Sequence, residues 1–254
     1  FDVTEIQIKE NGNTFIGKKR GTITSSDGII IKADEFEYNK KLNILKAKGK
    51  VEIRDNINDY VIYTDKITYK KNDNQIFTEK NSRAKNLTDN IEISAVNFEY
   101  NILENIITAE KKVILENKIE DYQISSEFLS YMRNDEKIFT KGKTIANIHS
   151  KYNLKTQNLI FYKNSMKLVS QDKTELTDKI NIYNLSKFNY LINLEMIKGE
   201  KILINSNYKL AKSDKFYFKS AIIDLKNKNF VAGDTEILMH KEIFDNSEND
   251  PRIK

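Results

Sequence analysis

The stretch that decides the fold is residues 33–51, which read ADEFEYNKKLNILKAKGKV. Its first half alternates Phe36 and Tyr38 with Glu35 and Glu37. Its second half alternates Leu45 and Ala47 with Lys46 and Lys48. An alternation with a period of two is typical of a strand with one buried face. The polar segment Asn39–Lys41 separates the two runs. Asparagine turns a chain without glycine because it tolerates positive φ, so the stretch predicts a β-hairpin.

This hairpin is one copy of a unit that recurs along most of the chain. The tyrosines that end the first strand recur every 31 residues, at Tyr38, Tyr69, Tyr100 and Tyr131. More degenerate copies are anchored at Ile8, Phe161, Tyr190 and Phe218. A small residue, where we expect close packing, follows six anchors by nine positions, at Ala47, Thr78, Ala109, Thr140, Ser170 and Gly199. Two motifs in phase indicate about eight hairpin repeats of roughly 30 residues.

A stack of such hairpins is the fold class that we expect. One hairpin cannot bury its apolar face alone, whereas stacked hairpins can. A repeat of this length has a contour of about 100 Å, far longer than an ordinary strand, so each arm is expected to bend across two facing sheets. The sequence therefore predicts an all-β, elongated stack with an open edge at each end.

Composition excludes several classes of function. The 254 residues carry 42 basic and 37 acidic side chains and no cysteine, which excludes disulfides, thiolate nucleophiles and cysteine-ligated zinc. The two histidines, His149 and His240, stand far apart in the sequence, so we expect no metal and no cofactor. The longest aliphatic runs, such as Ile29–Ile31, are too short for a membrane-spanning helix.

Charged residues also argue against catalysis and against nucleic-acid binding. Glu35 and Glu37 share one strand face and could imitate a glycosidase pair, but no histidine or pocket-forming loop lies near them in the sequence. The same acids interrupt any basic stripe of the kind that binds nucleic acid. Basic clusters such as Lys18–Arg20 and Lys111–Lys112 are read as a solvated face, with contact to lipid phosphates as the alternative. We expect a protein that is not an enzyme.

Residues 33–39, followed by residues 43–51, resemble the signature of the OstA-like lipopolysaccharide-transport family. The copies that end at Tyr69, Tyr100 and Tyr131 are similar but drift from the pattern. The resemblance implies a β-jelly roll, or β-taco, in which two sheets form a V with an apolar inside. Lipid A acyl chains lie in such a V, while the sugars and phosphates stay outside.

Within this family the chain looks most like the N-terminal periplasmic domain of the outer-membrane assembly member, LptD. That resemblance implies a jelly-roll domain over residues 1–245 and a linker over residues 246–254 toward a C-terminal β-barrel. It implies a non-enzymatic conduit at the periplasmic face of the Gram-negative outer membrane, which receives lipopolysaccharide from the periplasmic bridge and passes it on for assembly. Two alternatives stay open: a stand-alone LptA-like bridge protein, and a structural β-solenoid stalk.

The resemblance also assigns a lipid-contacting role to apolar residues of the repeats. The expected trough residues are Phe36, Tyr38, Val51, Ile53, Ile67, Tyr69, Phe98, Tyr100, Val113, Leu115, Leu129 and Tyr131. The alternation by itself is typical of an ordinary β core, so some of these residues are expected to close the core instead.

The partners follow from the open edges and from the family. An unpaired edge strand can accept a strand of another protein, so we expect residues 3–8 to join an LptA-like bridge protein by edge-strand addition. An LptE-like lipoprotein is the further expected partner if a barrel follows, and no nucleic acid is expected.

Overall fold

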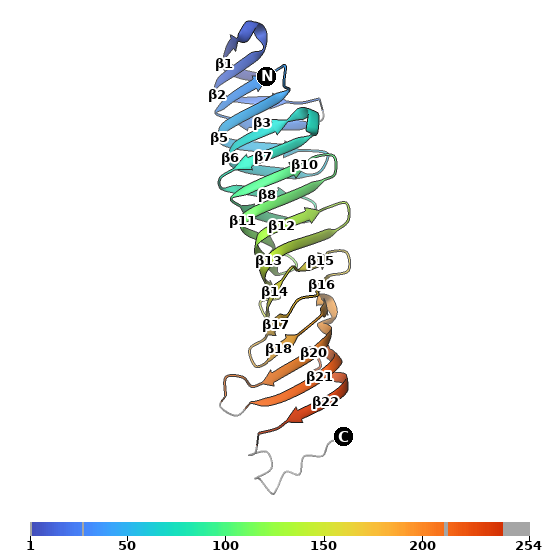
Figure 1. Cartoon of the computed structure of the whole chain (residues 1–254). Coiled ribbons are helices and arrows are strands. Elements are labelled where there is room, and N and C mark those ends of the chain that lie inside the picture. Colours follow the sequence, from blue (N-terminus) through green and yellow to red (C-terminus); the bar gives the residue numbers. More distant parts are fainter. Residues whose placement is uncertain (1, 27, 211–212, 241–254) are drawn as a thin grey trace. The chain divides into compact units, whose positions relative to one another are not determined.

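Strands make up nearly all regular structure in the computed structural model, which describes residues 2–26, 28–210 and 213–240 (Figure 1). The expected linker at residues 246–254 lies outside these ranges. The chain divides into two compact units, Phe1–Gly142 and Lys143–Lys254. The all-β prediction is confirmed, and the strand pairings described in each unit are antiparallel.

The first unit contains β1 (Asp2–Lys9), β2 (Thr14–Thr24), β3 (Ile29–Ala33), β4 (Glu35–Asn39), β5 (Ile44–Asp55), β6 (Tyr60–Lys70), β7 (Gln75–Glu79), β8 (Ser82–Asn86), β9 (Ile91–Ala95), β10 (Asn97–Asn101), β11 (Ile106–Asn117) and β12 (Tyr122–Met132). The boundary between the units falls within β13 (Lys137–Ile148). The second unit contains β14 (Tyr152–Gln157), β15 (Ile160–Tyr162), β16 (Lys167–Ser170), β17 (Thr174–Thr177), β18 (Ile182–Leu185), β19 (Phe188–Leu191), β20 (Met196–Ser206), β21 (Asp214–Asp224) and β22 (Asn229–Leu238).

Helical structure in the described ranges is limited to the short 3-10 turns η1 (Glu10–Gly12), η2 (Lys71–Asp73) and η3 (Ile192–Leu194). No helix in this part of the chain has the length and apolar character needed to cross a membrane.

Long strands bend at mid-length, as the repeat length predicts. On one side β5 pairs with β4 up to Lys48 and with β3 from Glu52 onward. On its other side β5 pairs with β6, and the register of that pairing shifts between Lys48 and Val51. Gly49 and Lys50 have φ values of 80° and 46° at this point. Such an insertion is a β-bulge, which re-aims a strand, so β5 contributes to two parts of the sheet. A second register shift lies 62 residues on in β11, between Glu110 and Val113, at two lysines with positive φ.

Asparagine turns recur at one end of the long strands of the first unit. Asn43, Asn74 and Asn105 have φ values of 54°, 51° and 55°, so asparagine turns the chain as predicted, although in the first copy the left-handed residue is Asn43 and not a residue of the predicted segment Asn39–Lys41. Each of these turns accepts a backbone hydrogen bond from the next one along the chain, as Ile102 N donates to Asn74 O at 3.0 Å. In each unit we call the turns at this end of the long strands the first turn row: residues 39–43, 70–74, 101–105 and 132–136 in the first unit, and residues 162–166, 192–195 and 224–228 in the second.

A second turn row lies at the other ends of the long strands. It comprises residues 55–59, 86–90 and 117–121 in the first unit, and 148–151, 178–181 and 206–209 in the second. Capping side chains hold it: Asp55 Oδ1 accepts from the backbone N–H groups of Ile57 and Asn58, both at 3.0 Å. Asn117 and Asp178 make the same two-donor contact in their own turns. These are Asx turns, which order a loop without glycine.

The core lies between the two turn rows, on the inner face of the strands. The small residues that follow the anchors are packed there, since Ala47 and Ala109 are at most 2% exposed. At Gly199 an added Cβ would lie 2.6 Å from Leu185 Cδ2. The prediction of close packing at these positions is therefore confirmed.

Candidate functional site

The predicted trough residues lie together in the interior of the first unit. Eleven of the twelve are at most 2% exposed: Phe36, Val51, Ile53, Ile67, Tyr69, Phe98, Tyr100, Val113, Leu115, Leu129 and Tyr131. Tyr38 is half-buried, and its hydroxyl donates to Asn43 Oδ1 at 2.8 Å. The structure thus brings the set into one apolar interior, in which the side chains pack as a closed core.

We call the gap between the two turn rows of a unit its mouth. In the first unit, polar contacts join the two rows and close this mouth. Asn58 of the second row donates through Nδ2 to Tyr100 Oη at 3.0 Å and to Ile102 O, in the first row, at 3.2 Å. The Tyr100 hydroxyl donates to Asp55 Oδ2 at 2.5 Å. Asp55 is 2% exposed, so these contacts are shielded from water and stronger than surface ones.

A second set of contacts, centred on Arg133 of the first row, lies beside the first. Arg133 Nε donates to Asp89 Oδ2 at 3.2 Å, and Arg133 Nη1 donates to Asn58 O at 2.8 Å. The Tyr131 hydroxyl donates to the same Asp89 oxygen at 2.9 Å. The Arg133 guanidinium also lies 5.9 Å from the centre of the Tyr60 ring. We call Asp55, Asn58, Asp89, Tyr100, Tyr131 and Arg133 the mouth latch.

The charge states of Arg133 and Tyr100 follow from their burial together with their carboxylate partners. The Arg133 and Asp89 side chains are only 17% and 13% exposed. Burial by itself lowers the pKa of Arg133, but the hydrogen bond and charge of Asp89 raise it overall, so the guanidinium stays charged. Burial raises the pKa of Tyr100, and the hydrogen bond to Asp55 adds to the effect. Both side chains therefore remain hydrogen-bond donors at neutral pH.

The second unit has a similar contact across its own mouth. Glu195 of the first turn row accepts from Lys151 Nζ at 2.6 Å and from the Tyr152 hydroxyl at 2.7 Å. The hydrogen bond from Lys151 lowers the pKa of Glu195, and that from Tyr152 lowers it further. Each unit thus closes part of its mouth with a carboxylate, a tyrosine and a cation.

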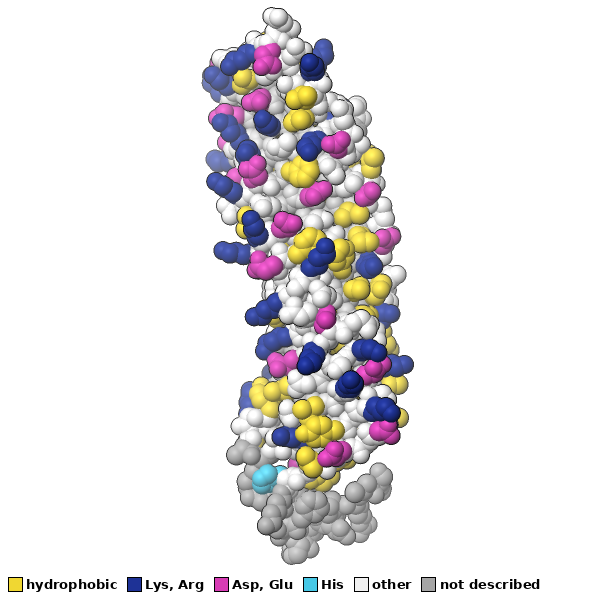
Figure 2. Space-filling model, viewed as in Figure 1, with side chains coloured by type: hydrophobic (Ala, Val, Ile, Leu, Met, Phe, Trp, Pro, Cys, Tyr) yellow, Lys and Arg dark blue, Asp and Glu magenta, His cyan; other side chains and the backbone are white. Residues whose placement is uncertain are grey.

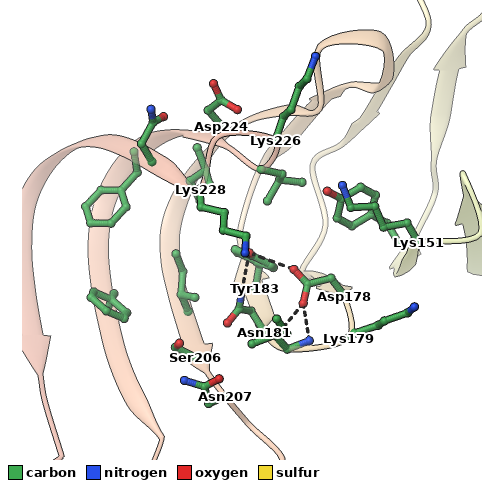
Figure 3. Close-up of a pocket in the computed structure, with 18 residues that line it drawn as sticks. Lys151, Asp178, Lys179, Asn181, Tyr183, Ser206, Asn207, Asp224, Lys226 and Lys228 are labelled. Atoms are coloured by element: carbon green, nitrogen blue, oxygen red, sulfur yellow. Dashed lines mark hydrogen bonds between the residues drawn. The ribbon is translucent and has the colours of Figure 1, made fainter. Parts of the chain in front are cut away.

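One part of the mouth of the second unit is open. A cavity of about 710 Å³ lies between the second-row turn 178–181 and the first-row turn 224–228 (Figure 3). Its apolar lining is Tyr152, Ile180, Tyr183, Ile204, Phe216, Ile223, Leu225 and Phe230. Burial, reinforced by the Asp178 charge, raises the pKa of Tyr183 to about 12. In the described residues no hydrogen bond joins these two turns, so the latch contacts have no counterpart here.

Aliphatic side chains project from the tips of both turn rows. They are 46–74% exposed: Leu42, Leu103 and Leu194 in the first row, and Ile57, Ile119 and Ile180 in the second. Figure 2 shows hydrophobic side chains in small groups on the visible face of each unit, with charged side chains between them. Turn tips usually carry polar residues. Here the exposed aliphatic side chains instead line the outer edge of the mouth.

The other predicted candidates lie outside this interior. Glu35 and Glu37 each pair with a lysine of the neighbouring strand, Lys48 at 2.9 Å and Lys46 at 3.6 Å, rather than with each other. Arg20 of the first basic cluster pairs with Asp34 at 3.1 Å, as on a solvated face with interleaved acids. Throughout the described ranges, no group of three or more His, Asp or Glu side chains is placed to hold a metal ion.

Sequence reasoning missed the polar side chains of the mouth. The caps Asp55, Asn86 and Asn117 recur every 31 residues, so the same period that identified the tyrosines could have revealed them. Arg133 and Glu195 carry no such signal, because in the repeats anchored at Tyr38, Tyr69 and Tyr100 the position of Arg133 holds lysine or isoleucine and the position of Glu195 holds asparagine. No protein-family model matches the chain, and no curated protein sequence matches it either.

Proposed function

We propose that the chain is a non-enzymatic conduit for lipopolysaccharide at the periplasmic face of the outer membrane, similar to the N-terminal domain of LptD. It receives the lipid from an LptA-like bridge protein and passes it to the outer membrane for assembly. The observation that carries the proposal is an apolar interior that continues from one hairpin repeat to the next between the two turn rows of the first unit. The resemblance of residues 33–51 to the OstA-like signature supports it.

The physical requirement for lipid transport matches such an interior. Hiding one methylene from water is worth about 0.8 kcal/mol, so exposing a 12-carbon chain costs on the order of 10 kcal/mol. A carrier must therefore offer continuous apolar surface along the whole path. A mouth along one side keeps the sugars and phosphates in water while the acyl chains are inside.

The packed interior of the first unit adds a condition to the proposal. Because Tyr69, Phe98 and Tyr131 are at most 2% exposed, acyl chains enter only if the two turn rows separate. Separation breaks the Arg133 contacts with Asp89 and Asn58. The exposed aliphatic tips of both rows then give the chains an apolar surface on the way in.

Photo-crosslinking in cells tests this function. A crosslinking amino acid at Tyr69 or Phe98 is expected to label lipopolysaccharide, whereas one at Tyr63, which is 45% exposed, is expected not to. Tyr100 is a poorer position, because replacing it removes the hydroxyl that holds Asp55. If neither interior position gives a lipopolysaccharide adduct in a folded, exported protein, the proposal is wrong.

The packing itself favours a second candidate, a structural β-solenoid stalk. A stalk needs a fully packed core and no opening, and Tyr100, Leu115, Leu129 and Tyr131 are fully buried. The same crosslinking experiment separates the two functions, since a stalk gives no lipid adduct from any interior position.

A further inference from the structure

The cavity of the second unit has walls suited to a hydrocarbon chain. Phe216 and Phe230 line it, with ring centres 6.1 Å apart, and Ile204 and Ile223 lie on the same wall. Its volume of about 710 Å³ lies within the range of about 300–1,000 Å³ that is usual for ligand pockets. Apolar walls of this size accept an alkyl chain without any change in the packed core of the first unit.

The rim of the cavity is cationic. Lys179, Lys226 and Lys228 line it and form no ion pair with any described residue. The Lys228 side chain extends from its turn toward the middle of the view of the cavity (Figure 3). A long lysine stem can lie along apolar surface while its ammonium group meets a polar ligand, so chain and headgroup can be bound side by side.

The acidic residues of the rim, Asp178 and Asp224, are fewer than these lysines and form no ion pair with them. Asp178 accepts from the backbone N–H groups of Ile180 and Asn181 at 2.7 and 2.6 Å, and from the Tyr183 hydroxyl at 3.3 Å. Asp224 accepts from Asn227 through its backbone N–H and its side-chain amide, both at 2.8 Å. Both carboxylates are thus hydrogen-bonded within their own turns, and because three lysines face two carboxylates the net charge of the rim is positive.

We propose that this cavity binds one amphiphile that has a hydrocarbon chain and an anionic headgroup, either a phosphate or a carboxylate. The chain lies against Phe216 and Phe230, and Lys179 and Lys228 contact the headgroup through charge-assisted hydrogen bonds. The inference rests on the proposed function and adds a place and a headgroup chemistry to it. The site accepts lipid in the conformation described, with the mouth latch of the first unit closed.

The absence of tryptophan from the sequence allows a direct test. Phe230→Trp introduces a single fluorophore into the cavity wall of the full chain, and Tyr63→Trp places one on the exposed surface of the first unit. Each protein is titrated, below micelle-forming concentration, with chain-brominated dodecyl phosphate, dodecanoate or dodecyl maltoside. Both anions are expected to quench the Phe230→Trp emission saturably, the neutral maltoside much more weakly, and the Tyr63→Trp emission is expected not to change. The tighter of the two anions identifies a phosphorylated lipid or a fatty acid as the source.

Charge reversal then tests the lysines in the Phe230→Trp background. Lys179→Glu together with Lys228→Glu is expected to raise the apparent Kd of the anion about tenfold, which corresponds to about 1.4 kcal/mol. Lys198→Glu makes the same kind of charge change at an exposed position of β20 outside the cavity, and is expected to leave the Kd unchanged. Circular dichroism and the urea midpoint confirm that each variant is folded.

Three results would overturn this inference: no saturable quenching, equal quenching by the maltoside, or equal loss of binding in the Lys198→Glu variant. None of them bears on lipopolysaccharide adducts at Tyr69 and Phe98, which decide the conduit proposal separately.

Discussion

Left-handed turn residues set the conformation of the first turn row one residue at a time. Asn74 has a φ of 51°, and its backbone N–H donates to Lys71 O at 3.2 Å. We expect Asn74→Gly to leave stability nearly unchanged, because glycine adopts this φ freely. Asn74→Ala should lower the free energy of unfolding by about 1 kcal/mol, because the alanine Cβ disfavours this positive φ and alanine has no polar side chain to compensate. Urea denaturation of the two variants checks this, and equal midpoints would contradict it.

Glu195 gives the second unit a pH-dependent contact. Its pKa is below the ordinary value of 4.5, first because of the hydrogen bond from Lys151. The folded chain therefore binds fewer protons here than the unfolded chain, and the stabilisation is present above about pH 4.5 and lost as the pH falls through the folded pKa. We expect the loss of urea stability between pH 7 and pH 4 to be smaller in Glu195→Gln than in wild type. Tyr152→Phe removes one of the two hydrogen bonds and should give an intermediate slope; identical slopes in all three proteins would exclude this role.

At the scale of elements, the mouth latch joins turns that are distant in sequence. Arg133→Ala should lower the free energy of unfolding by about 2 kcal/mol, because it leaves the buried carboxylate of Asp89 without its cation. Arg20→Ala is the matched control: Arg20 pairs with Asp34 with 49% and 43% of the side chains exposed, and such pairs are worth at most about 1 kcal/mol. Chemical denaturation compares the two variants. A loss for Arg133→Ala no greater than for Arg20→Ala would show that the latch does not hold the rows together.

The edge strand β1 carries the predicted contact with a bridge protein. In the described residues β1 pairs with β2 alone, and Ile6 is 46% exposed. Neighbouring N–H groups of a strand point to opposite sides, so one of Ile6→Pro and Gln7→Pro removes a donor to β2 and the other removes a donor on the free edge. We expect the variant that loses the donor on the free edge to weaken binding of an LptA-like protein with little change in melting temperature. The variant that loses the donor to β2 is expected to lower the melting temperature. Unchanged binding in both variants would overturn edge-strand addition.

Periodicity explains which elements the sequence could predict. The tyrosines at 31-residue intervals follow from a constraint that every rung shares, so they predicted the strands, the asparagine turns and the small packed residues. The latch joins Asp55 to Tyr100 and Asp89 to Tyr131, which are 45 and 42 residues apart. These offsets differ from the 31-residue period, because a contact across the mouth joins opposite ends of different rungs. The alternation of apolar residues along one face of the strands therefore could not predict these latch contacts.

At the scale of the whole molecule, alternation in sequence did not determine whether the interior is filled. A trough and a core require the same apolar residues, and the difference between them is the distance between the two turn rows. In the first unit the latch closes this distance, and the predicted trough residues pack against one another. In the second unit no hydrogen bond among the described residues joins turns 178–181 and 224–228, and a cavity remains between them. Under the proposed function, lipid loading of the first unit therefore depends on how often its two turn rows separate.

A population shift links the latch to the proposed transport. If lipid reaches the interior only when the rows of the first unit separate, weakening the latch raises the open fraction. Arg133→Ala should then increase lipopolysaccharide labelling from a crosslinker at Tyr69, by as much as about tenfold if about 1.4 kcal/mol of the lost stability acts on the opening step. Arg20→Ala, far less buried, should leave labelling unchanged, and labelling per molecule is compared at equal protein levels. Unchanged or reduced labelling in a folded Arg133→Ala protein would mean that lipid does not enter through this mouth.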